Sequence, residues 1–309
     1  MLMRYKYNSN ISIQAPKINS AYGWYFKIAS IISTYSLSKA IYFTLGRFYT
    51  IRRIFRLSRY IKSQLVLSSK NIQPLTDLVS SPPLEDSINS LRELGWCSGL
   101  VLSEIVVKEL QNLMNYQKFT CASNSNEITF KLQEREKFES NYNFPICHAR
   151  SIEPFDAEIY QSIKNDKVLV NISAFYFGYL PTNASIKLFA SFSTNATIQE
   201  RLAQKQPVYF HPDVDKRMHS LSFFFYLSSI DHKSGGHVLI PGTHKGKKWK
   251  ELFRSLNFSD DDIKKSYPSS KPVTICGNPG EGFAEDSFIF HKSLIPNSHD
   301  RYVIQISYW

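Results

Sequence analysis

The chain has 309 residues, of which 43% are hydrophobic and 14% aromatic, and it carries a formal net charge of +11. A composition this rich in apolar side chains excludes a disordered or fibrous protein and can form a sizeable core. The charge is uneven: residues 1–76 contain twelve Lys or Arg and no acidic residue, whereas the rest of the chain is close to neutral. The sequence therefore predicts a basic, partly helical N-terminal extension and linker over residues 1–88, followed by one globular domain over residues 89–309.

The cysteines and the apolar runs indicate in which cellular compartment the protein is expected. Four cysteines are scattered along the chain without a CxxC pair, which predicts reduced core thiols and excludes a zinc ribbon or a disulfide framework. No apolar run is long enough for a spanning helix, and the first residues lack the apolar region of a secretory signal. We expect a cytoplasmic protein that associates at most peripherally with a membrane surface.

The clearest helix of the extension is predicted over residues 51–67. At helical spacing its apolar side chains share one side: Ile51, Ile54, Phe55, Leu57, Ile61 and Leu65. The other side carries Arg52, Arg53, Arg56 and Arg59. Such a helix can bind an anionic membrane, but the commoner arrangement packs the apolar stripe on the body and leaves the arginines in water. The Ser-rich, acid-poor composition also fits a transit segment, and no motif for specific nucleic-acid recognition accompanies the charge.

In the body, helical spacing precedes strand spacing. Helices are expected over residues 103–116 and 168–179, with loops and short elements over 117–165. From residue 185 onward the period is two, which predicts strands at 186–193, 207–211, 221–228, 237–240, 273–276, 287–291 and 302–309. Residues 245–271 interrupt these strands as a flap. Helices followed by short strands predict a mainly β sandwich or barrel with flanking helices.

A metal site is predicted from His211, Asp213 and His291. On an extended backbone, His211 and Asp213 project to the same face because one residue separates them. His291 ends a distant expected strand and can supply the third ligand. Two imidazoles and a carboxylate suit Fe(II) and leave three coordination positions open, although zinc accepts the same atoms.

Arg301 extends this site. It lies on the polar face of the last expected strand, whose other face is apolar. A guanidinium near a metal suits a carboxylate partner, and the Ser293 hydroxyl can donate to the same carboxylate. Together with the metal ligands, these residues predict a site for a dicarboxylic keto acid that chelates the metal at one end and pairs with Arg301 at the other.

The remaining histidines and a group of lysines have less specific interpretations. We expect His244 to shape the site or bind a backbone group, and His219, His232 and His237 to lie at the surface or in turns. Four lysines follow His244 closely: Lys245, Lys247, Lys248 and Lys250. Such a run is usually a solvated face, and the alternative is a handle for an anionic small-molecule substrate.

Four segments between about Leu91 and Trp309 resemble the phytanoyl-CoA dioxygenase-like family of Fe(II)/2-oxoglutarate-dependent oxygenases. They read LRELGWCSGLVLSEIVVKEL, ISAFYFGYLP, YFHPDVDKRMHSLSFFFYLSSIDHKSGGHVLIPGTHKG and GNPGEGFAEDSFIFHKSLIPNSHDRYVIQISYW. The resemblance implies a double-stranded β-helix (jelly-roll, cupin-like) core. It implies iron held by His211, Asp213 and His291, and 2-oxoglutarate anchored by Arg301 with Ser293. It also implies hydroxylation of a small molecule with release of succinate and CO₂. Residues 1–90 have no counterpart in the family.

Two other functions compete with this hypothesis. A cupin-like isomerase or hydrolase would use the metal ligands without a keto acid, which leaves Arg301 unexplained. A catalytically silent jelly roll, whose basic arm binds a membrane or an acidic partner, would have no physical need for two histidines, an aspartate and an arginine that converge.

Overall fold

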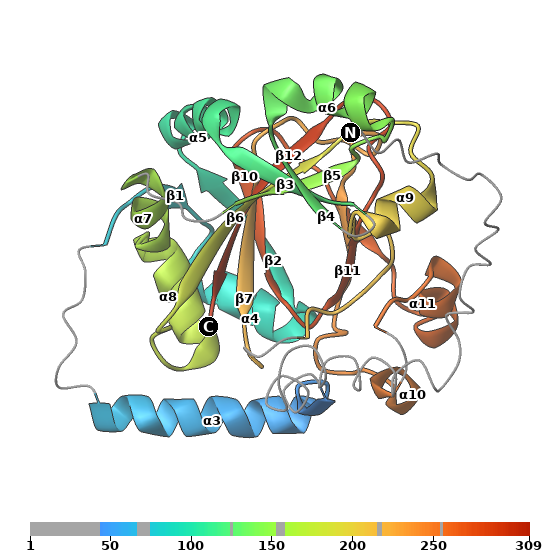
Figure 1. Ribbon diagram of the computed structural model, residues 1–309. Helices are drawn as coiled ribbons and strands as arrows, with labels where there is room; N and C mark the ends of the chain where they lie inside the picture. Colours follow the sequence, from blue (N-terminus) through green and yellow to red (C-terminus); the bar gives the residue numbers. More distant parts are fainter. Residues whose placement is uncertain (1–43, 67–74, 124–125, 153–157, 215–217, 254–255) are drawn as a thin grey trace.

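The computed structural model describes residues 44–66, 75–123, 126–152, 158–214, 218–253 and 256–309. In this part of the chain, two antiparallel sheets form the body and helices flank them (Figure 1). One sheet has 9 strands in the order β1-β2-β10-β7-β12-β6-β5-β3-β4, and the other has 3 in the order β11-β8-β9. The expected mainly β, jelly-roll class with flanking helices is confirmed.

The strands of the larger sheet are β1 (Val79–Ser80), β2 (Trp96–Leu102), β3 (Lys118–Ser123), β4 (Asn126–Lys131), β5 (His148–Ser151), β6 (Ala184–Ser191), β7 (Leu221–Tyr226), β10 (Glu281–Asp286) and β12 (Arg301–Tyr308). The smaller sheet contains β8 (His237–Ile240), β9 (Val273–Ile275) and β11 (Phe290–Ser293). The helices are α3 (Tyr49–Val66), α4 (Leu84–Leu94), α5 (Glu104–Tyr116), η1 (Leu132–Glu134), α6 (Arg135–Tyr142), α7 (Glu158–Lys164), α8 (Lys167–Phe177), α9 (Ile198–Ala203), α10 (Trp249–Leu252) and α11 (Asp260–Ser266).

The main core lies between the larger sheet and helices α4, α5, α7 and α8, and Leu110 of α5 and Leu188 of β6 are among its fully buried members. Helix α8 shows how the local sequence fixes one of these helices. The buried Asp166 carboxylate caps its first turn by accepting hydrogen bonds from the Val168 and Leu169 amides at 2.9 and 3.1 Å. The helix ends at Gly178, whose φ of 81° lies in the left-handed region that glycine tolerates.

Strand β12 separates the core from the interior between the sheets. Tyr308, Ile306 and Ile304 face the main core, as the alternation predicted. Val303 belongs instead to a second apolar cluster together with Phe224 and residues of neighbouring strands. Arg301 therefore starts the strand on the face that is turned away from the main core.

Several elements differ from the sequence prediction. Residues 117–165 were expected as loops and short elements, and the short elements they contain are β3, β4, η1, α6, β5 and α7. The strand expected at 287–291 is replaced by β10 and β11 with a turn between them. Residues 207–211 form only isolated bridges from Phe210 and His211, because Pro207 and Pro212 lack the N–H that a regular ladder needs. The expected domain boundary at residue 88 falls within α4.

Residues 245–271, expected as a flap, contain α10 and α11. Phe258 and Ile263 of this stretch pack against Phe210, Ile240 and Phe290. Ile240 and Phe290 belong to β8 and β11, so the stretch covers the smaller sheet on the side away from the metal-ligand candidates.

Helix α3 contacts the body through its arginines. The Arg52 guanidinium donates to the His244 carbonyl at 2.7 Å and lies 3.7 Å from the Asp286 carboxylate. Arg56 and Arg59 each donate to an oxygen of the body at 3.4 Å. The expectation that the arginines face water is wrong for these three residues, because the body offers oxygen atoms along α3. Within the described residues, no helix is long and apolar enough to cross a membrane.

All four cysteines are free thiols in the structure, as expected. Cys97, Cys121 and Cys147 are buried, and burial raises the pKa of each to about 12. A thiol with a raised pKa is a poor nucleophile and a poor metal ligand. These three residues therefore serve as core side chains.

Candidate metal and co-substrate site

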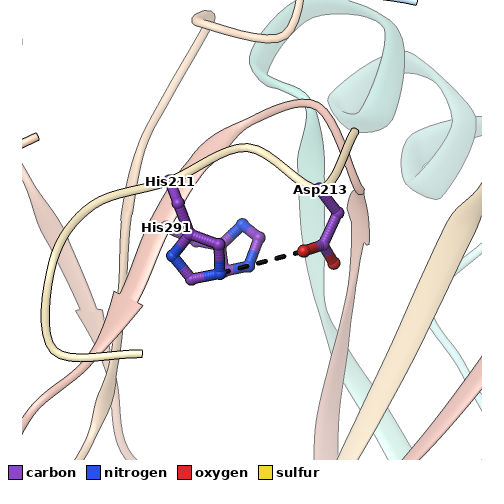
Figure 2. A group of neighbouring side chains, drawn as sticks. All are labelled: His211, Asp213 and His291. Carbon is purple, nitrogen blue, oxygen red and sulfur yellow. Dashed lines mark ion pairs between the residues drawn. The ribbon is translucent and has the colours of Figure 1, made fainter. Parts of the chain in front are cut away.

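The three predicted metal ligands lie together. One nitrogen or oxygen atom from each of His211, Asp213 and His291 lies within 4.8 Å of those of the other two. Figure 2 shows the two imidazole rings overlapping, with their nitrogen edges toward the Asp213 carboxylate. His211 Nε2 is 3.8 Å from Asp213 Oδ1, and the two ring centroids are 4.5 Å apart. The structure thus brings a two-histidine, one-carboxylate set to one point from segments about 80 residues apart in the chain.

Backbone pairing holds this geometry. His211 and His291 form an antiparallel bridge in which each amide donates to the other residue's carbonyl, at 3.0 and 3.1 Å. The Asp213 amide donates to the Ser287 carbonyl at 2.7 Å, in the turn between β10 and β11. Three main-chain hydrogen bonds therefore position the three side chains, although residues 207–211 form no regular strand.

Both imidazoles present Nε2 to the site. His211 Nδ1 lies 3.0 Å from the Tyr209 carbonyl, and His291 Nδ1 lies 3.1 Å from the Ile289 carbonyl. Because a carbonyl oxygen only accepts, each Nδ1 carries the proton and each Nε2 keeps its lone pair. Burial also lowers the pKa of His291, which favours the neutral form that binds a metal.

Arg301 is buried without an acidic partner among the described residues. Its Nη1 donates to the Ser293 hydroxyl at 3.2 Å, and its Nε has no hydrogen-bond partner there. Burial lowers the pKa of Arg301, and no described carboxylate lies within ion-pair distance of it. A buried cation of this kind is stable only with an anion, and the adjacent Ser293 hydroxyl suits a carboxylate oxygen.

A buried His237–Glu285 pair links the ligand set and Arg301. His237 Nε2 lies 2.9 Å from Glu285 Oε2, and Glu285 Oε1 lies 3.6 Å from His291 Nδ1. Burial, and then the positive charges of Arg301 and His211, hold the pKa of His237 well below its usual value. His237 is therefore within electrostatic reach of both the Arg301 guanidinium and the metal-ligand candidates.

Sequence reasoning missed this pair. His237 was expected at the surface or in a turn, which is wrong: it is buried and stacks on the His291 ring at 5.4 Å between centroids. Burial raises the pKa of Glu285 to about 7. Strand alternation could have found Glu285, since it shares a face of β10 with Phe283, which belongs to the cluster between the sheets.

The other candidates are also placed. His244 Nε2 lies 3.3 Å from the Arg92 carbonyl, so it binds a backbone group. His219 was expected near the surface, which is wrong: its buried ring lies 4.5 Å from that of Phe177. Lys247 is turned inward and donates to the Thr243 and Phe288 carbonyls, whereas the other three lysines of the run are exposed.

No family model matches the sequence, and no curated protein matches it either. The resemblance to the phytanoyl-CoA dioxygenase-like family therefore stays a prediction. Among solved structures, the chain is similar to AviO1 from Streptomyces viridochromogenes Tue57, at 13% identity and a TM-score of 0.46 over 74% of this chain and 96% of that one. It is similar to the non-heme alpha ketoglutarate dependent epimerase SnoN from nogalamycin biosynthesis, at 13% identity and a TM-score of 0.49 over 73% and 82%. It is also similar to EctD from S. alaskensis with bound Fe, at 15% identity and a TM-score of 0.47 over 76% and 81%.

Proposed function

We propose that this protein is a non-haem Fe(II)- and 2-oxoglutarate-dependent oxygenase that hydroxylates a small molecule. The observation that carries the proposal is the convergence of two Nε2 lone pairs and a carboxylate within 4.8 Å, accompanied by a buried arginine without an acidic partner among the described residues. A metal alone would satisfy the ligand set but leave the Arg301 charge uncompensated. A dicarboxylate that binds the metal at one end and Arg301 at the other would satisfy the ligand set and also compensate the Arg301 charge.

Each residue then has a defined role. His211, Asp213 and His291 hold the iron, with the Nδ1 hydrogen bonds fixing both rings in the orientation that binding needs. Arg301 and Ser293 hold the far carboxylate of 2-oxoglutarate. Phe224 and Phe283 pack against His237 and keep water from the space between the sheets. Bound Fe(II) and 2-oxoglutarate supply the oxidation of a C–H bond by O₂, with release of succinate and CO₂.

Anaerobic titration with Fe(II) and 2-oxoglutarate tests the proposal. A weak visible charge-transfer band should form only when both are present, because the keto acid must chelate the iron. In Asp213→Ala, the band and the coupled turnover of 2-oxoglutarate should both be lost. An isomerase or hydrolase would bind the metal without the band, and a silent scaffold would bind neither. Full 2-oxoglutarate turnover in Asp213→Ala would remove this residue from the site.

A further inference from the structure

Helix α3 exposes the apolar side of its surface. Ile54, Leu57 and Ile61 are 62%, 57% and 52% exposed, whereas Arg52 is 4% exposed. Their spacing of three and four residues places the three aliphatic side chains on one stripe. An amphipathic helix on a water-soluble protein normally turns this stripe to the core. In Figure 1, α3 runs along the lower edge of the molecule, and no described element covers its outward side.

Aromatic side chains extend this surface beyond the N-terminal end of α3. The Phe48 ring lies 6.0 Å from that of Trp249 and 5.8 Å from that of Phe253. Trp249 is 69% exposed, and Tyr60 on α3 is also exposed. Tyr and Trp combine an apolar ring with a polar group, the chemistry found at the boundary between lipid and water.

The exposed charged side chains of α3 are cationic. Arg53 and Lys62 of α3 are exposed, and so are Lys248 and Lys250 beside Trp249. No acidic residue occurs anywhere in residues 1–76. An exposed apolar stripe with a cationic border is complementary to a surface that is apolar inside and anionic at its rim.

We infer that the outward side of α3 is a docking surface for an anionic phospholipid membrane. The stripe of Ile54, Leu57 and Ile61 enters the boundary between headgroups and acyl chains, and the basic residues bind the lipid phosphates. Residues 1–43 are a less suitable cover, because they carry five Lys or Arg and no acid and would repel this surface. The arginines on the inward side remain free to hold α3 on the body.

The inward side of α3 places this surface next to the candidate site. Arg52 lies 3.4 Å above the Phe288 ring and 3.7 Å from Asp286. Between these two residues stands Ser287, whose carbonyl accepts the Asp213 amide. A membrane bound at α3 would therefore lie close to the candidate site, because α3 contacts the turn between β10 and β11, and this turn holds the Asp213 backbone.

Flotation of the full chain with lipid vesicles tests the inference. We expect binding to vesicles of phosphatidylcholine with phosphatidylglycerol, weakening as salt rises, and little binding to phosphatidylcholine alone. Replacing the stripe together, Ile54→Ser, Leu57→Ser and Ile61→Ser, should weaken binding about tenfold or more. The matched control, Ile105→Ser, Tyr116→Ser and Tyr142→Ser, changes three exposed apolar residues elsewhere and should leave binding unchanged.

Two further single-residue variants guard against misfolding of the stripe variant. Arg53→Gln and Lys62→Gln keep the stripe and should each weaken binding to anionic vesicles about fivefold. Circular dichroism and thermal unfolding should match the native chain. The inference is overturned if the native chain does not bind anionic vesicles, if it binds neutral vesicles equally well, or if the stripe variant binds as the native chain does. Stripe-dependent self-association or protein binding without lipid binding would also overturn it.

Discussion

Between the two sheets the chain buries polar side chains, and along α3 it exposes apolar ones. At the first place, Arg301 Nε is buried without a hydrogen-bond partner among the described residues, and two imidazole Nε2 atoms face a carboxylate. At the second, Ile54 and Leu57 lie in contact with solvent although polar Arg52 is buried. Each region reverses the usual distribution of polar and apolar groups between interior and surface.

The difference between the regions is the kind of group that completes each one. In the function that we propose, a metal ion binds the ligand set of the interior site, and a dicarboxylate binds Arg301, which has no acidic partner among the described residues. At the α3 surface, the proposed partner is an anionic phospholipid membrane, whose acyl chains would cover the apolar stripe and whose phosphates would bind the basic residues. Buried polar groups and exposed apolar groups of this kind are typical of binding sites, which is why we propose a ligand for each region.

Removal of a ligand candidate should have the largest effect. His291→Ala deletes one of the two Nε2 donors and should weaken Fe(II) binding about a hundredfold or more, since even partners outside the ligand shell account for about ten- to hundredfold. Anaerobic Fe(II) titration measures the change. His232→Ala, at an exposed histidine, serves as the control. Unchanged iron binding in His291→Ala would show that His291 is not an iron ligand.

Removal of the Arg52 guanidinium should cost stability at the α3 region. Burial alone would raise the pKa of Asp286, but the Arg52 charge keeps it below the usual value. Arg52→Ala leaves that carboxylate buried without its cation and should lower the free energy of unfolding by about 3 kcal/mol. Urea unfolding measures the loss, and the exposed neighbour variant Arg53→Ala should change it by less than about 0.5 kcal/mol. Equal behaviour of the two variants would contradict docking through the arginine side.

Loss of the Arg301 charge should affect the co-substrate more than the metal. Arg301→Gln removes the buried cation and should raise the apparent KM for 2-oxoglutarate about thirtyfold, the cost of leaving one charge of a buried pair alone. Fe(II) affinity should stay near native. The exposed variant Arg150→Gln should change neither quantity. A fall in Fe(II) affinity equal to the rise in KM would instead indicate general damage to the interior.

A smaller effect is expected from pH at the α3 interface. Burial lowers the pKa of His219 to about 3 although Asp286 opposes the shift, and the arginines of α3 add to it. Since the unfolded chain binds this proton near pH 6.5, the contribution is present above that pH and is lost as pH falls toward 3. At pH 5 the loss is about 2 kcal/mol. His219→Phe should flatten the fall in unfolding free energy between pH 6.5 and 5, and an unchanged slope would exclude His219 as its source.

Short-range spacing in the sequence predicted much of the site. The His211–Asp213 spacing and the alternation of β12 depend on strand geometry alone. In an extended segment, side chains two positions apart share a face, so these predictions need no knowledge of neighbouring strands. The same reasoning did not find β3, β4 and β5. Strands β3 and β4 pair with each other as a hairpin, but the short β5 pairs with β3 and β6, so its strand conformation depends on segments elsewhere in the chain. This reasoning also could not find the Glu285–His237 contact, which joins strands of different sheets.

The sequence by itself determined the residue types at the site, the mainly β class and the amphipathic pattern of α3, since these follow from composition and from the periods of helix and strand. Only the tertiary structure decided that Asp213 meets His291 through a backbone contact with Ser287, that Arg301 is buried beside Ser293, and that α3 turns its arginines inward. Those outcomes depend on which oxygen atoms the folded body presents, and a periodic pattern in one segment carries no information about its neighbours in space.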